Sequence, residues 1–305
     1  MLNRRILRIK AFKAIYSYAE NPGMTLKDTE ALLDISCEST RDLYLFLLSV
    51  VGPLTAEASA RIEAARSKFN PTEEERNPNL KFTQNRIAPL LANDPDFAKL
   101  IKKKKFSWDQ YDVFLRRLYE SVRGRKYFYE YMNSGESSIA EDARLFVRIF
   151  EREFEDNRDL ADILEDMSIY WGDDLGYALT WVCRTLKSIG EGESWNLPAL
   201  YQSELPGNEA MESDHRFVVK LLRGAYSGFE RFCDSVAELT PQWNRDRLCM
   251  TDLVLIACGM AEAEMDTQMP RRIIINEYVE ISKFYSTPES SAFVNGLLDK
   301  LINRQ

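Results

Sequence analysis

The sequence predicts an all-α protein, and three observations lead to this fold class. Glycine and proline are sparse, with 13 and 11 among 305 residues, so helix-breaking positions are few. Apolar residues recur at i, i+3 and i+4 along most of the chain, which is the period of a helix buried on one face. Runs that alternate apolar and polar residues, as a half-buried strand would, are hard to find.

The first predicted helix covers residues 4–20 and is basic. Asn3 is suited to cap it, but Arg4, Arg5 and Arg8 occupy its first turns, where acidic residues are usual. Cations beside the positive end of the helix macrodipole are mildly unfavourable, and a bound phosphate would reverse that penalty. The pattern therefore indicates an anion site at this helix, with an ordinary solvated basic helix end as the alternative.

The middle of the chain, residues 21–209, predicts a helical region of its own. Its expected loops are marked by Asn70-Pro71, Asn77-Pro78, Asn93-Asp94-Pro95 and Ser134-Gly135. Its expected helices fall at residues 27–66, 85–101, 107–132, 139–154, 158–166 and 173–187.

Two motifs in this middle region leave their role open. Four lysines, Lys102 to Lys105, precede Phe106 and Trp108. Basic residues beside aromatics are typical of nucleic-acid binding, but lysines also favour a helix C-terminus, where they are simply solvated. The segment of residues 81–86, with Lys81, Phe82, Asn85 and Arg86, suits either a buried anchor or a contact loop.

The last third of the chain predicts a helical bundle from about residue 210, which ends in a helical hairpin. Thr287 is expected to cap the second hairpin helix, with Pro288 at its first position and Glu289 in its first turn. The apolar positions at helical spacing are Ile274, Tyr278, Ile281 and Tyr285 before the corner, and Phe293, Val294, Leu297, Leu298, Leu301 and Ile302 after it.

Composition and motifs exclude several classes of protein. The five cysteines are odd in number and have no Cys-x-x-Cys spacing, which argues against a disulfide framework or a zinc site and favours buried thiols. We expect no apolar run of membrane-spanning length and no signal peptide, hence a cytoplasmic protein without a membrane partner. His215 is the sole histidine and has no nucleophile paired with it by motif. Because phosphate and dinucleotide loops are also missing, we expect neither an enzyme nor a cofactor.

The net charge of −8 is distributed unevenly. Residues 1–20 carry five cations (Arg4, Arg5, Arg8, Lys10 and Lys13) against the single acid Glu20. A basic first helix on an acidic chain predicts a local anion site rather than a generally basic surface.

Four segments in order carry a resemblance to a known family. The hairpin reads Ile-Asn-Glu at 275–277 and Phe-Val-Asn-Gly-Leu-Leu-Asp-Lys at 293–300. Residues 215–248 hold a helix, a Pro-x-Trp turn and a following arginine, and residues 250–262 hold the next helix. Together with the arginine-rich residues 3–18, these segments resemble the NusB family of bacterial transcription antitermination factors. The resemblance leaves residues 21–209 uncovered.

The resemblance implies binding of boxA, a short single-stranded RNA element. Such RNA is held by basic side chains on phosphates and by aromatic rings on bases. Tyr16 and Phe293 have core packing as their alternative role, Ile6 replaces an often basic residue, and Trp243 follows Pro241 near another RNA-side aromatic of the family. The RNA-binding residues that the resemblance implies are Arg4, Arg5, Arg8, Tyr16, Glu289 and Phe293.

The resemblance also implies protein partners. Family members pair with the ribosomal protein NusE and act on the RNA polymerase elongation complex with other Nus factors. Asp252 matches an acidic residue that faces NusE, with a first-turn capping role as its alternative.

The resemblance divides the chain into three parts and leaves two functions open. The expected NusB-like bundle comprises residues 1–20 and 210–305, and residues 21–209 form an inserted helical domain. The first function is an RNA-binding antitermination factor. The second is a protein scaffold that keeps only the NusE interaction, which the thinned arginine cluster and the acidic net charge favour.

Overall fold

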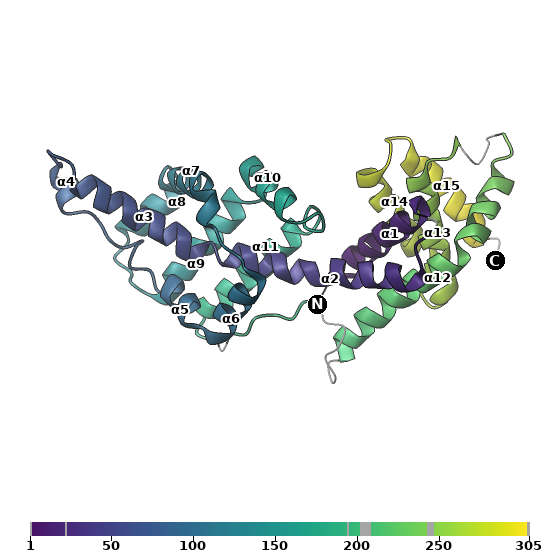
Figure 1. Ribbon diagram of the computed structural model, residues 1–305, viewed down its shortest axis with the longest axis horizontal. Coiled ribbons are helices and arrows are strands. Elements are labelled where there is room, and N and C mark those ends of the chain that lie inside the picture. Colours follow the sequence, from purple (N-terminus) through teal and green to yellow (C-terminus); the bar gives the residue numbers. More distant parts are fainter. Residues whose placement is uncertain (1, 22, 194, 202–208, 243–246, 304–305) are drawn as a thin grey trace. The chain divides into compact units, whose positions relative to one another are not determined.

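The computed structural model describes residues 2–21, 23–193, 195–201, 209–242 and 247–303, and every regular element in these ranges is a helix (Figure 1). This confirms the all-α prediction. The chain forms two compact units. Unit 1 comprises residues 1–38 and 200–305, and unit 2 comprises residues 39–199, whereas the sequence-based division placed its boundaries after residues 20 and 209.

Unit 1 is built around two helices that are buried on nearly every side. In α13 every residue from Asp252 to Glu262 is buried, and α1 buries Ile6, Leu7 and Phe12. Both pack against α12, and α13 also packs against α14 and α15. The helices of unit 1 are α1 (Arg4–Glu20), the first part of α2 (Leu26–Leu48), α12 (Glu209–Leu239), α13 (Met250–Met265), α14 (Arg271–Tyr285) and α15 (Ser290–Asn303).

The predicted C-terminal hairpin is present. Ile274, Tyr278 and Ile281 of α14 are buried, as are Val294 and five further positions of α15 at helical spacing, among them Leu297, Leu298, Leu301 and Ile302. The second helix begins at Ser290 rather than at Pro288, because residues 288 and 289 form a turn in which Ser290 N donates to Thr287 O over 3.0 Å.

Unit 2 is a larger set of shorter helices in which α9 is central. Helix α9 packs against α11, α8, α7 and α5. Its helices are the remainder of α2, α3 (Val51–Arg66), α4 (Glu73–Arg76), α5 (Ile87–Asn93), α6 (Pro95–Lys104), the 3-10 turn η1 (Asp109–Tyr111), α7 (Asp112–Arg123), α8 (Lys126–Asn133), α9 (Ile139–Glu153), α10 (Arg158–Met167) and α11 (Leu175–Gly190).

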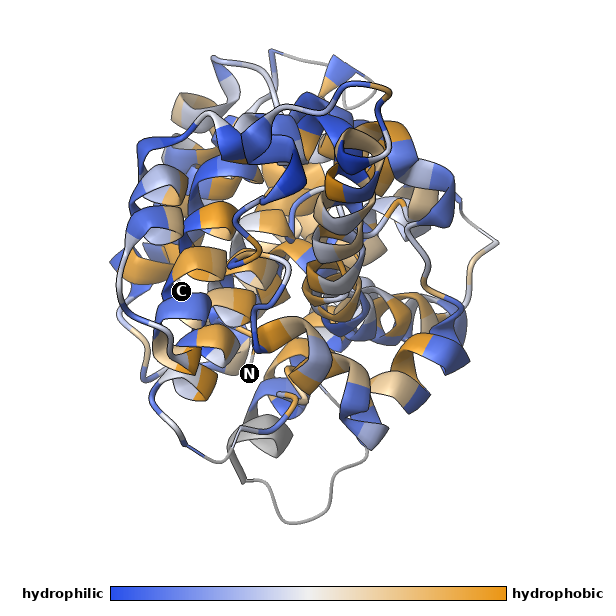
Figure 2. Ribbon diagram, turned by 90° about the vertical axis from the view of Figure 1, so that its left-hand side faces the viewer, coloured by the Kyte–Doolittle hydropathy of each residue, from blue (hydrophilic) through white to orange (hydrophobic). Residues whose placement is uncertain are grey.

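Three long helices expected in this region are each divided. The expected helix at 27–66 breaks at residues 49–50, and the one at 107–132 breaks after Arg123. The one at 85–101 breaks at Asp94, whose carboxylate accepts from Phe97 N over 2.7 Å and caps α6 ahead of Pro95. Each break follows from local chemistry that apolar spacing alone does not report, here a capping aspartate before a proline. Figure 2 shows hydrophobic and hydrophilic residues on opposite sides of many of the resulting helices.

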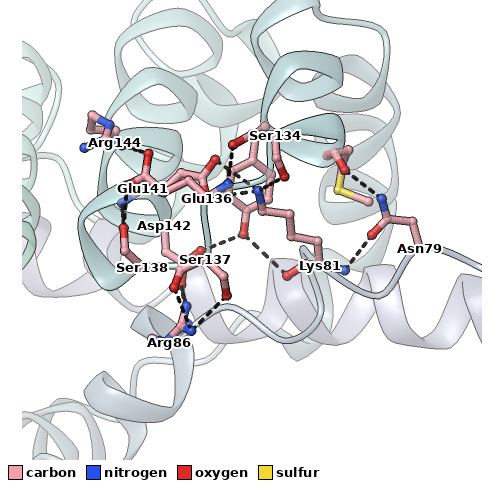
Figure 3. Close-up of polar contacts among 12 residues, drawn as sticks. Asn79, Lys81, Arg86, Ser134, Glu136, Ser137, Ser138, Glu141, Asp142 and Arg144 are labelled. Atoms are coloured by element: carbon pink, nitrogen blue, oxygen red, sulfur yellow. Dashed lines mark hydrogen bonds and ion pairs between the residues drawn. The ribbon is translucent and has the colours of Figure 1, made fainter.

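The segment of residues 79–86 is an anchor between helices and not a contact loop (Figure 3). Phe82 is fully buried, and Lys81 Nζ donates to Glu141 Oε1 over 3.0 Å and to Ser134 O over 3.1 Å. Arg86 N donates to Asp142 Oδ2 over 2.9 Å. Because Glu141 and Asp142 lie in the first turn of α9, their charges also favour that helix.

Cysteines and apolar stretches give two further outcomes. Four of the five cysteines are buried, Cys249 is exposed, and all are free, as expected. The expectation about membrane-spanning length was wrong for residues 26–66, which contain an 18-residue window long and apolar enough to cross a membrane. That window is 56% buried inside the protein, as in a core helix, and a turn at residues 49–50 interrupts the segment.

Close packing around Gly259 of α13 generates a first prediction. A Cβ atom at this position would lie 2.8 Å from Leu298 Cδ2 and 3.3 Å from Tyr278 Cδ2. We expect Gly259→Ala to lower the free energy of unfolding by about 1–3 kcal/mol, as overpacking does. Gly296 of α15, also helical, has no atom within 4 Å of such a Cβ, so Gly296→Ala should raise it by about 0.5–1 kcal/mol. Urea unfolding of both variants tests this, and equal effects would contradict it.

Candidate nucleic-acid interface

Arg8 and Glu262 form a buried ion pair at the centre of unit 1. Arg8 is 3% exposed and Glu262 is 0% exposed. The guanidinium is bidentate, since Nη2 donates to Glu262 Oε1 over 2.6 Å and Nε donates to Glu262 Oε2 over 2.9 Å. Paired guanidinium and carboxylate groups of this geometry are among the stronger hydrogen-bonded interactions in proteins. The pair joins α1 to α13.

Two residues of α14 complete this polar cluster. The hydroxyl of Tyr278 donates to Glu262 Oε2 over 2.8 Å. Glu277 Oε2 accepts from Arg8 Nη1 over 3.3 Å, and the carboxylate of Glu277 also accepts from Arg5 Nη2 over 2.8 Å and from Arg5 Nε over 3.0 Å. Hydrogen bonds thus connect α1, α13 and α14 through the five residues Arg5, Arg8, Glu262, Glu277 and Tyr278.

The environment sets the protonation of the cluster. Burial by itself lowers the pKa of Arg8, but the hydrogen bond and the charge of Glu262 outweigh it and hold that pKa above its ordinary value. Burial, followed by the charge of Glu262, raises the pKa of Tyr278 well above its ordinary value, so its hydroxyl stays protonated and donates. The hydrogen bond from Arg5 lowers the pKa of Glu277.

Arg8 was expected at an RNA surface, and the structure places its side chain inside the bundle. Helix α1 is enclosed by α12, α13 and α14, so a residue on almost any side of its middle turns faces another helix. The guanidinium of Arg8 is committed to the carboxylates of Glu262 and Glu277. Its charge therefore stabilises the packing of α1 rather than lying on the surface.

Arg4 and Arg5 remain at the surface. The Arg5 side chain is half-exposed and holds the outer side of Glu277. The Arg4 guanidinium lies 4.1 Å from the centre of the Phe217 ring, and its Nε is 3.6 Å from Asp214 Oδ1. Exposed pairs of this kind contribute up to about 1 kcal/mol, so both cations are able to exchange partners at little cost.

A row of aromatic rings continues the surface from Arg5 along α1 and α14. Phe12 is buried, and its ring centre lies 5.3 Å from that of Tyr285 and 6.3 Å from that of half-buried Tyr16. Lys13 Nζ lies 5.3 Å from the centre of the Tyr285 ring. Phe284, the neighbour of Tyr285, is 82% exposed. We name Arg5, Lys13, Tyr16, Phe284 and Tyr285 the α1/α14 strip.

The sequence analysis did not select Lys13, Phe284 or Tyr285 as RNA-binding residues. Tyr285 was interpreted as a core position because its spacing from Ile281 is helical, and Phe284 was not singled out. The signal in the sequence was the pair Phe284-Tyr285 at the last turn of a helix, since two adjacent aromatic residues cannot both face the same core.

The hairpin corner is held by Asp252, which was expected at a protein interface. Asp252 is 5% exposed, and its two carboxylate oxygens accept from Ser286 Oγ over 2.7 Å and from Ser290 Oγ over 2.8 Å. This fixes the start of α15 onto the first turn of α13. The same corner leaves Glu289 exposed and Phe293 half-buried. Trp243 lies outside the residues that the structure describes.

Comparison with known proteins connects this architecture to a family. The model of the NusB family matches residues 184–303. The transcription antitermination protein NusB of Myxococcus xanthus is 33% identical over 127 residues, which cover 36% of this chain and 91% of that protein. The NusB of Thermoanaerobacter sp. (strain X514) is 30% identical over 124 residues, covering 37% and 88%. The NusB of Syntrophotalea carbinolica is 33% identical over 90 residues, covering 30% and 58%. No solved structure matches the chain significantly.

The buried ion pair generates a second prediction. Glu262→Ala leaves the charge of Arg8 buried without its main partner, and we expect the free energy of unfolding to fall by about 3–5 kcal/mol. Glu264→Ala, also in α13, removes the partner of the exposed Arg231 and should cost about 1 kcal/mol or less. Urea unfolding of both variants measures the difference, and similar losses would show that the Arg8 pair is no stronger than a surface pair.

Glu277 generates a third prediction, on acid stability. Because its pKa is lowered in the folded protein, chiefly by the hydrogen bond from Arg5, it contributes stability above the ordinary glutamate pKa of 4.5. This contribution is lost as the pH falls through the lower folded-state pKa. The melting temperature of Glu277→Gln should therefore fall less steeply below about pH 4.5 than that of the wild type. A parallel decline of the two proteins in thermal melts over this pH range would contradict the assignment.

Proposed function

Because this chain belongs to the NusB family, whose curated members are transcription antitermination proteins, we propose that it binds boxA-type single-stranded RNA through unit 1 as an antitermination factor. The observation that supports this most directly is the α1/α14 strip. It joins cations to exposed or half-buried aromatic rings on one continuous surface. Single-stranded RNA is bound by this combination, because cations hold phosphates and rings stack on bases.

The proposal assigns a role to each surface residue. Arg4 and Arg5 take the RNA backbone, because guanidinium groups bind phosphate in a bidentate manner and both now hold only exposed carboxylate partners. Lys13 adds a third cation. Tyr16 and Phe284 offer ring faces for stacking.

The hairpin corner contributes a second set of contacts. Glu289 is exposed and accepts from a base amino group, and half-buried Phe293 offers the edge of its ring to a base. Asp252 holds this corner through Ser286 and Ser290, so its influence on any partner passes through the position of Glu289 and Phe293.

Arg8 acts on RNA binding indirectly in this proposal. By holding Glu262 and Glu277 it sets the position of α1 against α13 and α14, and Glu277 in turn orients Arg5. Arg8 is therefore a positioning residue for the α1/α14 strip and not a phosphate ligand.

The proposed partners follow from the family. The protein carries RNA together with the ribosomal protein NusE to the elongating RNA polymerase with other Nus factors, works in the cytoplasm and performs no chemistry. A second candidate, a scaffold that binds NusE but not RNA, is favoured by one observation. With Arg8 buried, fewer exposed cations remain on α1 of a chain whose net charge is −8.

RNA-binding anisotropy separates the two candidates and is a fourth prediction. We expect Arg5→Glu/Lys13→Glu to weaken binding of a labelled boxA-type RNA by about 1–3 kcal/mol. The log–log salt dependence of the affinity should flatten by about 0.7 for each phosphate that the variant no longer neutralises. The matched control is Arg223→Glu/Arg231→Glu, which reverses two exposed, ion-paired arginines of α12 in the same unit.

The control variant should bind RNA as the wild type does. Equal weakening by both double variants would show non-specific attraction to any cation of unit 1. NusE binding without measurable RNA affinity, alone or with NusE present, would overturn the RNA proposal in favour of the scaffold.

A further inference from the structure

Unit 2 has an open apolar groove that the proposed RNA function does not use. Its volume is about 430 Å³, which falls within the range of ligand-binding pockets. The groove lies among the end of α2, the start of α3, helices α5 and α6, and residues 106–109. Its apolar walls come from Leu48, Pro53, Leu91, Phe97, Ile101, Phe106 and Trp108.

The groove exists because the residues around its mouth are small. Gly52, Ala88, Ala92 and Ala98 line it, and none has a side chain long enough to fill the space. Ala92 and Ala98 are exposed, so the hollow is open to solvent along α5 and α6. A bulky apolar side chain supplied from outside would bury the half-exposed Ile101 against its walls, at about 25 cal/mol for each Å² of apolar surface removed from water.

One wall is rigid. Trp108 is 2% exposed and stacks on Phe46, with ring centres 4.2 Å apart and planes at 14°, and on Phe114 at 5.5 Å. Its indole Nε1 donates to Ser49 Oγ over 3.0 Å. The groove is therefore held open by packed side chains and does not depend on a loop that must rearrange, which lowers the entropic cost of binding.

The α6 side of the groove carries a row of lysines. Lys102 lines the groove, Lys99, Lys103 and Lys105 are exposed beside it, and Lys104 pairs with Asp42 over 2.7 Å. A lysine-rich last turn alone is what the helix macrodipole favours. Its place along an apolar groove is what indicates a ligand with both an apolar and an acidic side.

We propose that this groove binds an acidic amphipathic helix of a partner protein. Two or three bulky apolar side chains at helical spacing fill the hollow, and carboxylates on the adjoining face meet Lys102 and its neighbours. This is the helix-in-groove mode of peptide recognition, with charge pairing to set orientation.

RNA fits this groove less well than a helix does. The aromatic rings of the lysine motif do not offer their faces as stacking platforms, since Trp108 is enclosed between Phe46 and Phe114, and Phe106 is half-buried against Phe46 and Trp171. A base placed in the hollow would also leave its polar edge against apolar walls without hydrogen-bond partners, which is costly.

Fluorescence anisotropy with the full chain tests this proposal and is the fifth prediction. The probe is a synthetic labelled peptide with leucine at i, i+3, i+4 and i+7 and glutamate at the flanking positions. A second peptide has the same composition in scrambled order, and a third has lysine in place of glutamate. We expect the first peptide to bind, the scrambled one not to, and the affinity of the first to fall with salt.

Two variants and one control locate the binding site. Ala98→Glu places a charged side chain in the hollow at an exposed helical position and should abolish binding while the melting temperature stays unchanged. Lys102→Glu/Lys103→Glu should weaken the acidic peptide roughly tenfold or more and strengthen the lysine peptide. The control Arg116→Glu/Arg117→Glu reverses two exposed cations of α7 in the same unit and should change neither affinity.

Three outcomes would overturn the proposal. One is the absence of binding by the acidic peptide, and another is binding that Ala98→Glu leaves intact. The third is a single-stranded RNA whose affinity falls on Lys102→Glu/Lys103→Glu while the peptide does not bind, which would make the lysines an RNA surface. Each is separate from the test of the α1/α14 strip, because none of these variants lies in unit 1.

Discussion

The arrangement of unit 1 depends on the buried pair of Arg8 and Glu262. Two charges taken out of water are costly, and the cost is offset here because the guanidinium is bidentate and Tyr278 donates to the same carboxylate. The pair can form only when α1 lies against α13 with α14 beside both. It therefore specifies one arrangement of three helices, where apolar packing alone would tolerate several, and a one-residue shift of α1 would leave a buried charge unpaired.

This constraint connects the core to the proposed RNA surface. Glu277 accepts from Arg8 on its inner side and from Arg5 on its outer side, so the orientation of an exposed cation follows from a buried one. Asp252 does the same for the hairpin corner, because it holds Ser286 and Ser290 from inside and leaves Glu289 exposed. In both places an acid of α13 or α14 determines where surface residues lie.

Unit 2 uses acidic residues in a similar way and has a different surface. Glu141 and Asp142 of α9 hold the segment around Lys81 and Arg86, which leaves that basic segment no part in a contact surface. The lysines at the end of α6 differ, because most of them lie exposed beside an apolar groove. The two units thus present different ligand chemistries, a strip of cations and rings in unit 1 and an apolar groove with a basic margin in unit 2.

The sequence by itself determined the all-α class, the hairpin and the family, because helical periodicity, proline positions and ordered motifs are local properties of the chain. Only the tertiary structure decided which charges are buried. Arg5 and Arg8 lie one turn apart in the same basic helix and look alike in sequence, yet Arg5 is exposed and Arg8 is enclosed. The difference comes from Glu262, a residue 254 positions away whose carboxylate lies beside α1 only after the bundle has formed.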